Sequence, residues 1–364
     1  MDIGYLYQPV YLIVVAILTL VMMADYRSVK SFPNRNGRLG NKGLALMLTI
    51  FLVLVIGNRP TMSLYLGDTR NYASWYLMYD MGNSFAWDWN SENFIFDNIY
   101  SLFASNHIPI EFFFLFISLI YFGGIFIACK KMFPNDTTLA LLVYLAAFST
   151  FSYSTNGIKS GAAAAIFLLA LAYRKKIVIA ILLLWVSLGF HHSMLVPIAS
   201  FFMAYFYRNP KVYLWAWIVC LLLAVAHVTF FMSLFSGYTD EHGASYLVAD
   251  NVAKDVSGFR PDFILYSAIP IFIGYHLINK RRIISEMYNF LWCTYTMANC
   301  VFLLCTYGSY INRIAYLSWL MYPFVLIYPF LHFQWNPNQN RYLRYTVYGH
   351  LGFTLFMSFV YYGI

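Results

Sequence analysis

The feature that most constrains this chain is a series of long apolar runs separated by short polar segments. In a bilayer every backbone N–H and C=O group must be satisfied within the chain, so membrane-spanning segments are helices or closed barrels. Barrel strands alternate over about ten residues, whereas an upright helix needs about 20 apolar residues. The runs therefore predict an all-α fold, a polytopic transmembrane helical bundle in which residues 1–364 form a single integral-membrane domain.

The charge content excludes a soluble domain. Only 10% of the 364 residues are charged and 61% are hydrophobic, whereas about 25% of a typical soluble domain is charged. We expect about 12 spans, and re-entrant segments are an alternative for those shorter than ~20 residues. Their approximate bounds are 8–24, 43–57, 111–129, 138–153, 160–173, 177–190, 193–207, 212–234, 263–279, 288–307, 314–332 and 345–362.

The distribution of basic residues predicts the orientation of the spans. The segment after the first run is strongly basic, and basic loops stay in the cytoplasm, so the N-terminus is expected outside. Alternating from there, most basic residues fall inside and most acidic residues outside. The first run has no Lys or Arg before it, which predicts a retained span rather than a cleaved signal peptide. The net charge of +8 then reflects contact with anionic membrane lipid, and no nucleic-acid partner is expected.

Metal and cofactor motifs are missing from the sequence. The five cysteines lie in or beside apolar runs without a CxxC pair, so neither a disulfide framework nor a zinc site is indicated. No HExxH, DxD or phosphate-binding loop occurs. We therefore expect no metal and no cofactor.

Two long segments are expected on the outside, at residues 58–110 and 235–262. The first contains "YLGDTRNYASWYLMYDMGNSFAWDWN", which mixes aromatic rings with carboxylates and amides. Such groups suit carbohydrate, although an interfacial aromatic belt or an amphipathic helix on the membrane surface is the alternative. The second is long for a connection between two spans, and long loops often bind ligands.

Several cations are expected on this same outside face, which the charge bias disfavours. Arg70, Lys159, Arg260 and Arg313 lie at or near predicted span ends. Arg binds phosphate bidentately and Lys supplies a point charge, so a lipid diphosphate would fit them. Structural ion pairs with nearby carboxylates such as Asp262 are the alternative.

The sixth predicted span ends in "LGFHHSMLVP", which places His191 and His192 outside. A histidine at a span end can act as a general base. An interfacial hydrogen-bonding role is the alternative.

Four blocks, "FSYSTNGIKSGAAAAIFLLALAY", "LGFHHSMLVP", "FRPDFILYSAIPIFIGY" and "SYINRIAYLSWLMYPFVLIYP", follow one another along the chain. In order and position they resemble the EpsG-type branch of the Wzy-like bacterial polysaccharide polymerases. "YLGDTRNYASWYLMYD" is similar to the family's Gly-x-Asp-x-x-x-Tyr block, with Gly67, Asp68 and Tyr72. The resemblance covers about residues 59–330.

The resemblance implies a fold related to the C-type glycosyltransferases and a multi-pass protein of the bacterial inner membrane, with its site facing the exterior. It implies an enzyme, a metal-independent glycosyltransferase that makes O-antigen, exopolysaccharide or capsule. The expected partners are an oligosaccharide on undecaprenyl diphosphate and membrane lipid, and a chain-length regulator is left open. Matching positions are Asp68, Lys159, His191, Arg260, Asp262 and Arg313.

These positions suggest roles in transfer of a growing glycan from its diphosphate to a lipid-linked repeat unit. Arg260 and Arg313 would hold the diphosphate, with Lys159 or Arg70 assisting and Asp262 orienting Arg260 or contacting a sugar. His191 or Asp68 would be the base, His191 being favoured because its unperturbed pKa lies nearer neutrality. Tyr72 would contact substrate. One departure is that the family's Asn-x-x-Arg-Gln appears here as Asn156 followed by Lys159 and Ser160, and Lys lacks the bidentate fork.

Three other functions fit a polytopic protein with these features. A flippase or transporter of lipid-linked sugars would more often show two similar halves and broken helices near the midplane. A glycan acyltransferase would need a His-dependent site fed by a cytoplasmic acyl donor. A non-catalytic assembly scaffold is the third alternative.

Overall fold

The computed structural model describes the chain except for residues 1, 26–41, 81–84, 237–258, 309 and 364. All regular secondary structure in the described part is helical, as the apolar runs predict. The chain forms two compact units. The first comprises Met1–His191 with Asn336–Ile364, and the second comprises His192–Trp335.

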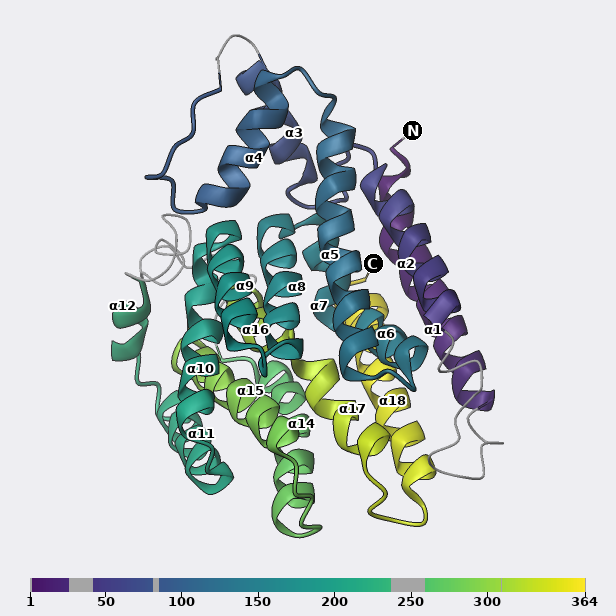
Figure 1. The fold of residues 1–364 in the computed structure, drawn as a ribbon, viewed down its shortest axis with the longest axis vertical. Helices are drawn as coiled ribbons and strands as arrows, with labels where there is room; N and C mark the ends of the chain where they lie inside the picture. Colours follow the sequence, from purple (N-terminus) through teal and green to yellow (C-terminus); the bar gives the residue numbers. More distant parts are fainter. Residues whose placement is uncertain (1, 26–41, 81–84, 237–258, 309, 364) are drawn as a thin grey trace. The chain divides into compact units, whose positions relative to one another are not determined.

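The first unit contains the helices of the N-terminal half and the last helices of the chain (Figure 1). They are η1 (Ile3–Leu6), α1 (Tyr7–Asp25), α2 (Lys42–Gly57), α3 (Thr69–Asp80), α4 (Phe94–Ser105), α5 (Ile110–Met132), α6 (Thr137–Leu145), α7 (Phe148–Thr155), α8 (Ile158–Ala172), α9 (Ile177–Phe190), α18 (Gln339–Leu355) and the π-helical η5 (Phe356–Tyr361).

Helix α5 lies at the centre of this unit, packed against α2 on one side and α8 on the other (Figure 1). Small residues allow the close approach to α8. A Cβ added at Gly124 would lie 3.0 Å from the Cβ of Ala165, and the four alanines of "AAAA" in α8 are fully buried. Contacts of this kind favour helix association in lipid, where burial of apolar surface gives no drive.

Helices α6 and α7 together are long and apolar enough to form one membrane span, but they are bent by 75° at the break between them. Side chains from α1 and α18 donate hydrogen bonds to backbone carbonyls at this break. The hydroxyl of Tyr11 donates to the carbonyl of Leu145 at 2.8 Å, and that of Thr354 donates to the carbonyl of Ala146 at 2.8 Å. The carbonyls freed by the break are therefore satisfied without water, as a membrane interior requires.

The second unit contains η3 (His192–Met194), α10 (Leu195–Phe206), α11 (Pro210–Val225), α12 (Phe230–Ser236), α14 (Pro261–Asn279), α15 (Glu286–Leu304), α16 (Ile311–Trp319) and α17 (Tyr322–His332). Helix α15 packs against α10, α11, α14, α16 and α17. A chain of buried polar groups links α15 to α11 and α16. The indole N–H of Trp217 donates to Asn299 at 2.8 Å, and Asn299 donates to Ser318 at 3.0 Å.

Each expected span overlaps helix, and the spans differ in length. The expected span 212–234 is interrupted, because α11 ends at Val225 and α12 begins at Phe230. Within the described residues four helices are long and apolar enough to cross a membrane, or five if the bent pair is one span, and five shorter apolar helices accompany them. The number of spans and the outside N-terminus stay predictions. The segment 58–110, expected as an outside loop, contains α3 and α4. Most of the segment 235–262 and of the basic segment after α1 lies outside the described residues.

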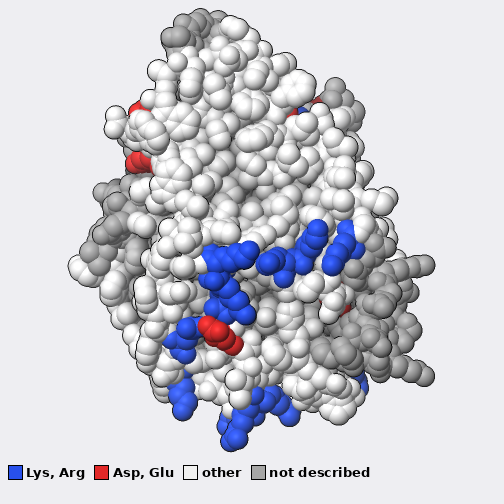
Figure 2. Space-filling view, in the orientation of Figure 1, with Lys and Arg blue, Asp and Glu red and all other residues white. Residues whose placement is uncertain are grey.

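The ends of α5 and α8 that carry or are followed by basic residues lie close together in the first unit. Lys131 follows the apolar part of α5, and its Nζ lies 4.9 Å from the ring centre of Tyr173, just beyond the end of α8. The basic ends of α5 and α8 therefore lie together, and Lys159 marks the opposite end of α8. Figure 2 shows Lys and Arg side chains gathered in a few groups, with most of the remaining face uncharged.

Candidate functional site

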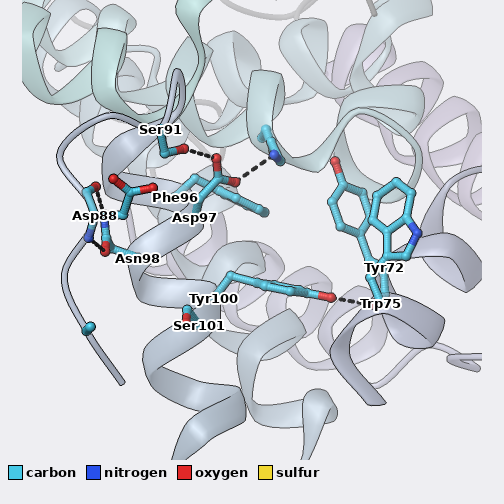
Figure 3. Close-up of a pocket in the computed structure, with 11 residues that line it drawn as sticks. Tyr72, Trp75, Asp88, Ser91, Phe96, Asp97, Asn98, Tyr100 and Ser101 are labelled. Carbon is cyan, nitrogen blue, oxygen red and sulfur yellow. Dashed lines mark hydrogen bonds and ion pairs between the residues drawn. The ribbon is translucent and has the colours of Figure 1, made fainter. Parts of the chain in front are cut away.

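A cavity of about 410 Å³ lies in the first unit at the N-terminal end of α8. It is bounded by α3, α4 and the segment that precedes α4 (Figure 3). Its lining residues are Tyr72, Trp75, Ala86, Asp88, Ser91, Phe96, Asp97, Asn98, Tyr100, Ser101 and Lys159.

Helix α4 contributes five of the eleven residues that line this cavity. Phe96, Tyr100 and Ala104 recur at a spacing of four residues and are buried, which anchors the helix. Asp97 and Ser101 have the same spacing one residue later, so they share the adjoining face and line the cavity.

A charged cluster forms at one side of the cavity. The Nζ of Lys159, in the first turn of α8, lies 2.7 Å from Oδ1 of Asp97. The hydroxyl of Ser91 donates to Oδ2 of Asp97 at 2.5 Å (Figure 3). The ammonium group also lies 5.0 Å from the ring centre of Phe96, a cation–π distance. Both oxygens of Asp97 are thus engaged, and the side chains of Lys159 and Asp97 keep 23% and 35% exposure.

Aromatic rings form the rest of the wall. Tyr72 packs edge-on against Trp75 at 5.8 Å, and its backbone carbonyl accepts the hydroxyl of Tyr100 at 2.5 Å. In Figure 3, Tyr72 and Trp75 lie across the cavity from Asp88 and Asn98. Aromatic faces opposite amide and carboxylate groups match the C–H faces and hydroxyl rims of sugars.

The segment before α4 is fixed to that helix by a reciprocal pair of hydrogen bonds. The amide of Asp88 donates to Oδ1 of Asn98 at 2.8 Å, and Nδ2 of Asn98 donates to the carbonyl of Asp88 at 2.7 Å. Asn98 is 3% exposed. The polar wall is therefore held in place by buried contacts.

The Gly67–Tyr72 block meets the turn between α7 and α8. The amide of Asp68 donates to Oδ1 of Asn156 at 3.0 Å, and the hydroxyl of Thr69 donates to the carbonyl of Thr155 at 2.8 Å. Gly67 has φ +58°, which favours glycine. The structure thus brings together two blocks that are separate in the sequence.

Arg59 is buried and contacts this block through a hydrogen bond to Thr69. It is 2% exposed, its Nε donates to Thr69 at 2.9 Å, and its Nη1 donates to the carbonyl of Ile56 at 2.9 Å. Its Nη2 has no hydrogen-bond partner, and Phe114 lies 4.1 Å from Cζ. Burial lowers the pKa of Arg59 to about 9, so the guanidinium stays protonated at pH 7.

In the second unit Arg260 and Asp262 form the pair that their spacing suggested. Nε of Arg260 lies 2.9 Å from Oδ1 of Asp262, and Nη2 lies 2.5 Å from Oδ2. Arg260 precedes Pro261, the first residue of α14, and its Cζ lies 4.1 Å from the ring centre of Phe263. Arg313, in α16, is exposed, with Cζ 5.4 Å from the ring centre of Tyr310. The bidentate pair fits both the orienting role and the structural alternative.

The predicted site residues of the first unit fall in different places. Tyr72 and Lys159 line the cavity. Asp68 accepts a hydrogen bond from Asn71 at 3.3 Å, and Arg70 is exposed without an ion pair to another described residue. His191 follows α9, directly after Phe190, whose ring contacts the cavity residue Phe96 at 6.4 Å.

Sequence reasoning missed Asp97 and Ser91 as site residues, and it gave Arg59 no role. The signal for Asp97 was present in "NFIFDNIYSLF", where polar residues share one helical face of an otherwise apolar helix. Neither Ser91 nor the buried Arg59 carried a comparable signal. Among the described residues no group of three or more His, Cys, Asp or Glu could hold a metal ion.

Comparison with known proteins identifies a family. No curated protein and no solved structure matches the chain. Residues 43–363 match the EpsG family, a range that extends from α2 to the end of the chain and includes the cavity and the Arg260–Asp262 pair. This match confirms the resemblance of the sequence blocks, and the chain therefore belongs to the EpsG family.

Proposed function

We propose that this EpsG-family protein is a membrane-embedded polysaccharide polymerase that transfers a growing glycan from undecaprenyl diphosphate to a lipid-linked repeat unit on the external face. Family membership supports the polymerase role, and the apolar helices support an integral membrane protein. The observation that carries the finer proposal is the cavity of the first unit, where aromatic rings face a Lys–carboxylate cluster.

The cavity has the chemistry of a site for sugars. Its volume of about 410 Å³ falls in the range of small-ligand pockets. Tyr72 and Trp75 offer ring faces, and the opposite wall offers Asp88 as a hydrogen-bond acceptor. We assign this cavity to the terminal sugars of the lipid-linked repeat unit.

The transfer exchanges one C–O bond for another. A hydroxyl of the acceptor sugar attacks the anomeric carbon of the donor glycan, the bond to the diphosphate breaks, and undecaprenyl diphosphate leaves with the electron pair. The hydroxyl proton passes to a base, for which His191 and Asp68 are the candidates. The leaving group is already good, so positioning and charge stabilisation would supply most of the rate.

Arg260 and Arg313 are assigned to the diphosphate. Arg260 already holds a carboxylate in bidentate geometry through Nε and Nη2, which is the geometry that phosphate oxygens also accept. Asp262 orients the guanidinium. Lys159 lines the sugar cavity, where its Nζ lies 2.7 Å from Asp97, so we assign it to that cavity rather than to the diphosphate.

The family match favours neither a flippase nor an acyltransferase. The deciding experiment incubates purified protein in detergent with undecaprenyl-diphosphate repeat units and separates the products by size. A ladder with release of undecaprenyl diphosphate, formed without nucleotide sugar, is expected. Unchanged substrate, together with movement of lipid-linked sugar across liposomes, would refute the polymerase and favour a flippase.

A matched pair of variants tests the diphosphate role. R260A and R313A are expected to abolish the ladder while the protein still reaches the membrane. R208A is the control, because Arg208 forms an ion pair with Glu286 at 2.5 Å in the same unit on a segment predicted to lie inside. Wild-type ladders from both R260A and R313A would contradict the assignment.

A further inference from the structure

Five aromatic side chains form a continuous row beside the sugar cavity. The row, called the aromatic row below, consists of Phe85, Trp87, Trp89, Phe94 and Trp185. Successive ring centres lie 6.4, 5.3, 6.0 and 5.4 Å apart. The three Trp side chains are 43%, 69% and 51% exposed in chain order, so their faces are open to a ligand.

One end of the row lies at an apolar face of α9. Trp185 continues a stripe of exposed apolar residues on this helix, with Val178, Ile181 and Leu182 at helical spacing. Such a stripe is expected to face lipid. Trp185 is close to the end of the helix at Phe190, and an exposed Trp near the end of an apolar helix is typical of the membrane interface.

The segment that carries Phe85, Trp87 and Trp89 borders the cavity, although none of the five rings lines the cavity itself. Asp88 stands between Trp87 and Trp89 in the sequence, and both Asp88 and Ser91 line the cavity. Close packing holds α9 against α4, because a Cβ added at Gly189 in α9 would lie 2.6 Å from the side chain of Ile95 in α4. The row therefore runs from the apolar face of α9 along the segment that forms one wall of the sugar cavity.

The polar residues among the rings argue for carbohydrate rather than for lipid headgroups. The sequence "WDWNSEN" alternates rings with carboxylates and amides. The amide of Asn90 donates to Oδ1 of Asp88 at 2.8 Å, and Glu92 is exposed. Carboxylates beside the rings would repel an anionic membrane surface, whereas they accept hydrogen bonds from sugar hydroxyls.

The spacing of the rings is also suited to a glycan. Ring separations of 5.3 to 6.4 Å are comparable to the length of one pyranose along a chain. The three exposed Trp rings can each pack against the C–H face of a sugar, and flat rings bind with little loss of side-chain entropy.

We propose that the aromatic row is a binding track for the part of the glycan between its lipid anchor and the cavity. The proposal rests on the proposed function for the identity of the glycan. The track would hold successive sugars of a chain that begins at the membrane, so longer glycans would bind more tightly than single repeat units.

The test measures binding of lipid-free oligosaccharides, which requires no polymerisation. Full-length protein in detergent is titrated with fluorescently labelled oligosaccharides of one and three repeat units, released from the producing strain's polysaccharide. W87A/W89A is expected to bind the three-unit chain about tenfold more weakly, which equals about 1.4 kcal/mol. Its affinity for one unit should stay within about twofold, and W87F/W89F should recover most of the loss.

Trp215 provides the control, because it is 65% exposed on α11 in the second unit and W215A should bind like wild type. Equal binding of the three-unit chain by W87A/W89A and wild type would overturn the proposal, as would the absence of length dependence in wild type. Unchanged glycan binding with poorer membrane insertion would overturn it in favour of an interfacial belt. Length-dependent binding by a wild-type protein that forms no ladder would refute the polymerase and leave the track standing.

Discussion

Replacing Gly67 with Ala should disconnect the Gly67–Tyr72 block from the turn that carries Lys159. Gly67 has φ +58°, and a residue with a Cβ pays about 1–2 kcal/mol in this region. The new Cβ would lie 2.6 Å from Cγ and Oδ1 of Asn156, so Asn156 must move. The hydrogen bond from the amide of Asp68 to Oδ1 of Asn156 is then lost, which costs about 1 kcal/mol.

The two effects predict that G67A lowers the free energy of unfolding by about 2–3 kcal/mol. The free energy of unfolding can be measured by denaturation in mixed detergent. Ladder formation by the same variant should also fall, because Tyr72 and Lys159 line one cavity. G352A is the control, because a Cβ at Gly352 meets nothing within 4 Å and Ala is the better helix former.

A double-mutant cycle with Asn156 separates the backbone strain at position 67 from the loss of the hydrogen bond. N156A alone removes the hydrogen bond without adding a Cβ at Gly67. G67A/N156A should therefore cost about 1 kcal/mol less than the sum of the single changes, because one hydrogen bond can be lost only once. Additive costs, or a G67A protein as stable as G352A, would refute the reasoning.

Three further changes have clear expected outcomes. D97N should reduce ladder formation more than K159R, because K159R keeps a cation to face the carboxylate at 2.7 Å whereas D97N leaves the ammonium without its partner; equal losses would contradict this. R59M should leave the unfolding free energy unchanged or raise it, because a buried charge without a counter-ion among the described residues is removed together with its two hydrogen bonds. Ladder formation should nevertheless fall, because Thr69 loses its hydrogen bond from Arg59. A large loss of stability would show that the charge is compensated. Hydrogen bonds from the backbone N–H groups of Gly4 and Leu64 lower the pKa of Asp2 below 3.8. The contribution of Asp2 to stability is therefore present above that pH and is lost as the pH falls through the lowered pKa. D2N should remove this acid dependence from thermal unfolding followed between pH 6 and pH 3.

The helical fold could be predicted from the sequence because lipid leaves few alternatives. Apolar runs marked the helices, as in α5 and α14, and basic residues marked their ends. The break between α6 and α7 could not be predicted, because the run from Thr137 to Thr155 is apolar and contains no Pro or Gly. The break is stabilised by Tyr11 and Thr354, which are distant from it in the sequence. Their hydroxyls can donate to the carbonyls at the break only once the chain has packed.

The site could be predicted only in part. The chemistry of the segment 58–110 was visible in its rings and carboxylates, and Tyr72 and Lys159 do line one cavity. Asp97 was missed because a single carboxylate within "NFIFDNIYSLF" also fits the polar side of an amphipathic helix. Its importance comes from Lys159, which is 62 residues away in the sequence and 2.7 Å away in space.

The broken helix and the cavity are connected through the turn between α7 and α8. A straight span would carry the chain beyond the end of α6 in one direction, whereas the 75° bend redirects α7 so that its C-terminal end meets the Gly67–Tyr72 block. Gly161 completes the turn, because a Cβ there would lie 2.3 Å from the carbonyl oxygen of Tyr153, so α8 can begin directly beside the end of α7. Lys159 is thereby placed in the first turn of α8, within reach of Asp97. Since the break itself is stabilised by Tyr11 of α1 and Thr354 of α18, helices that contribute nothing to the lining of the cavity determine where its cation lies.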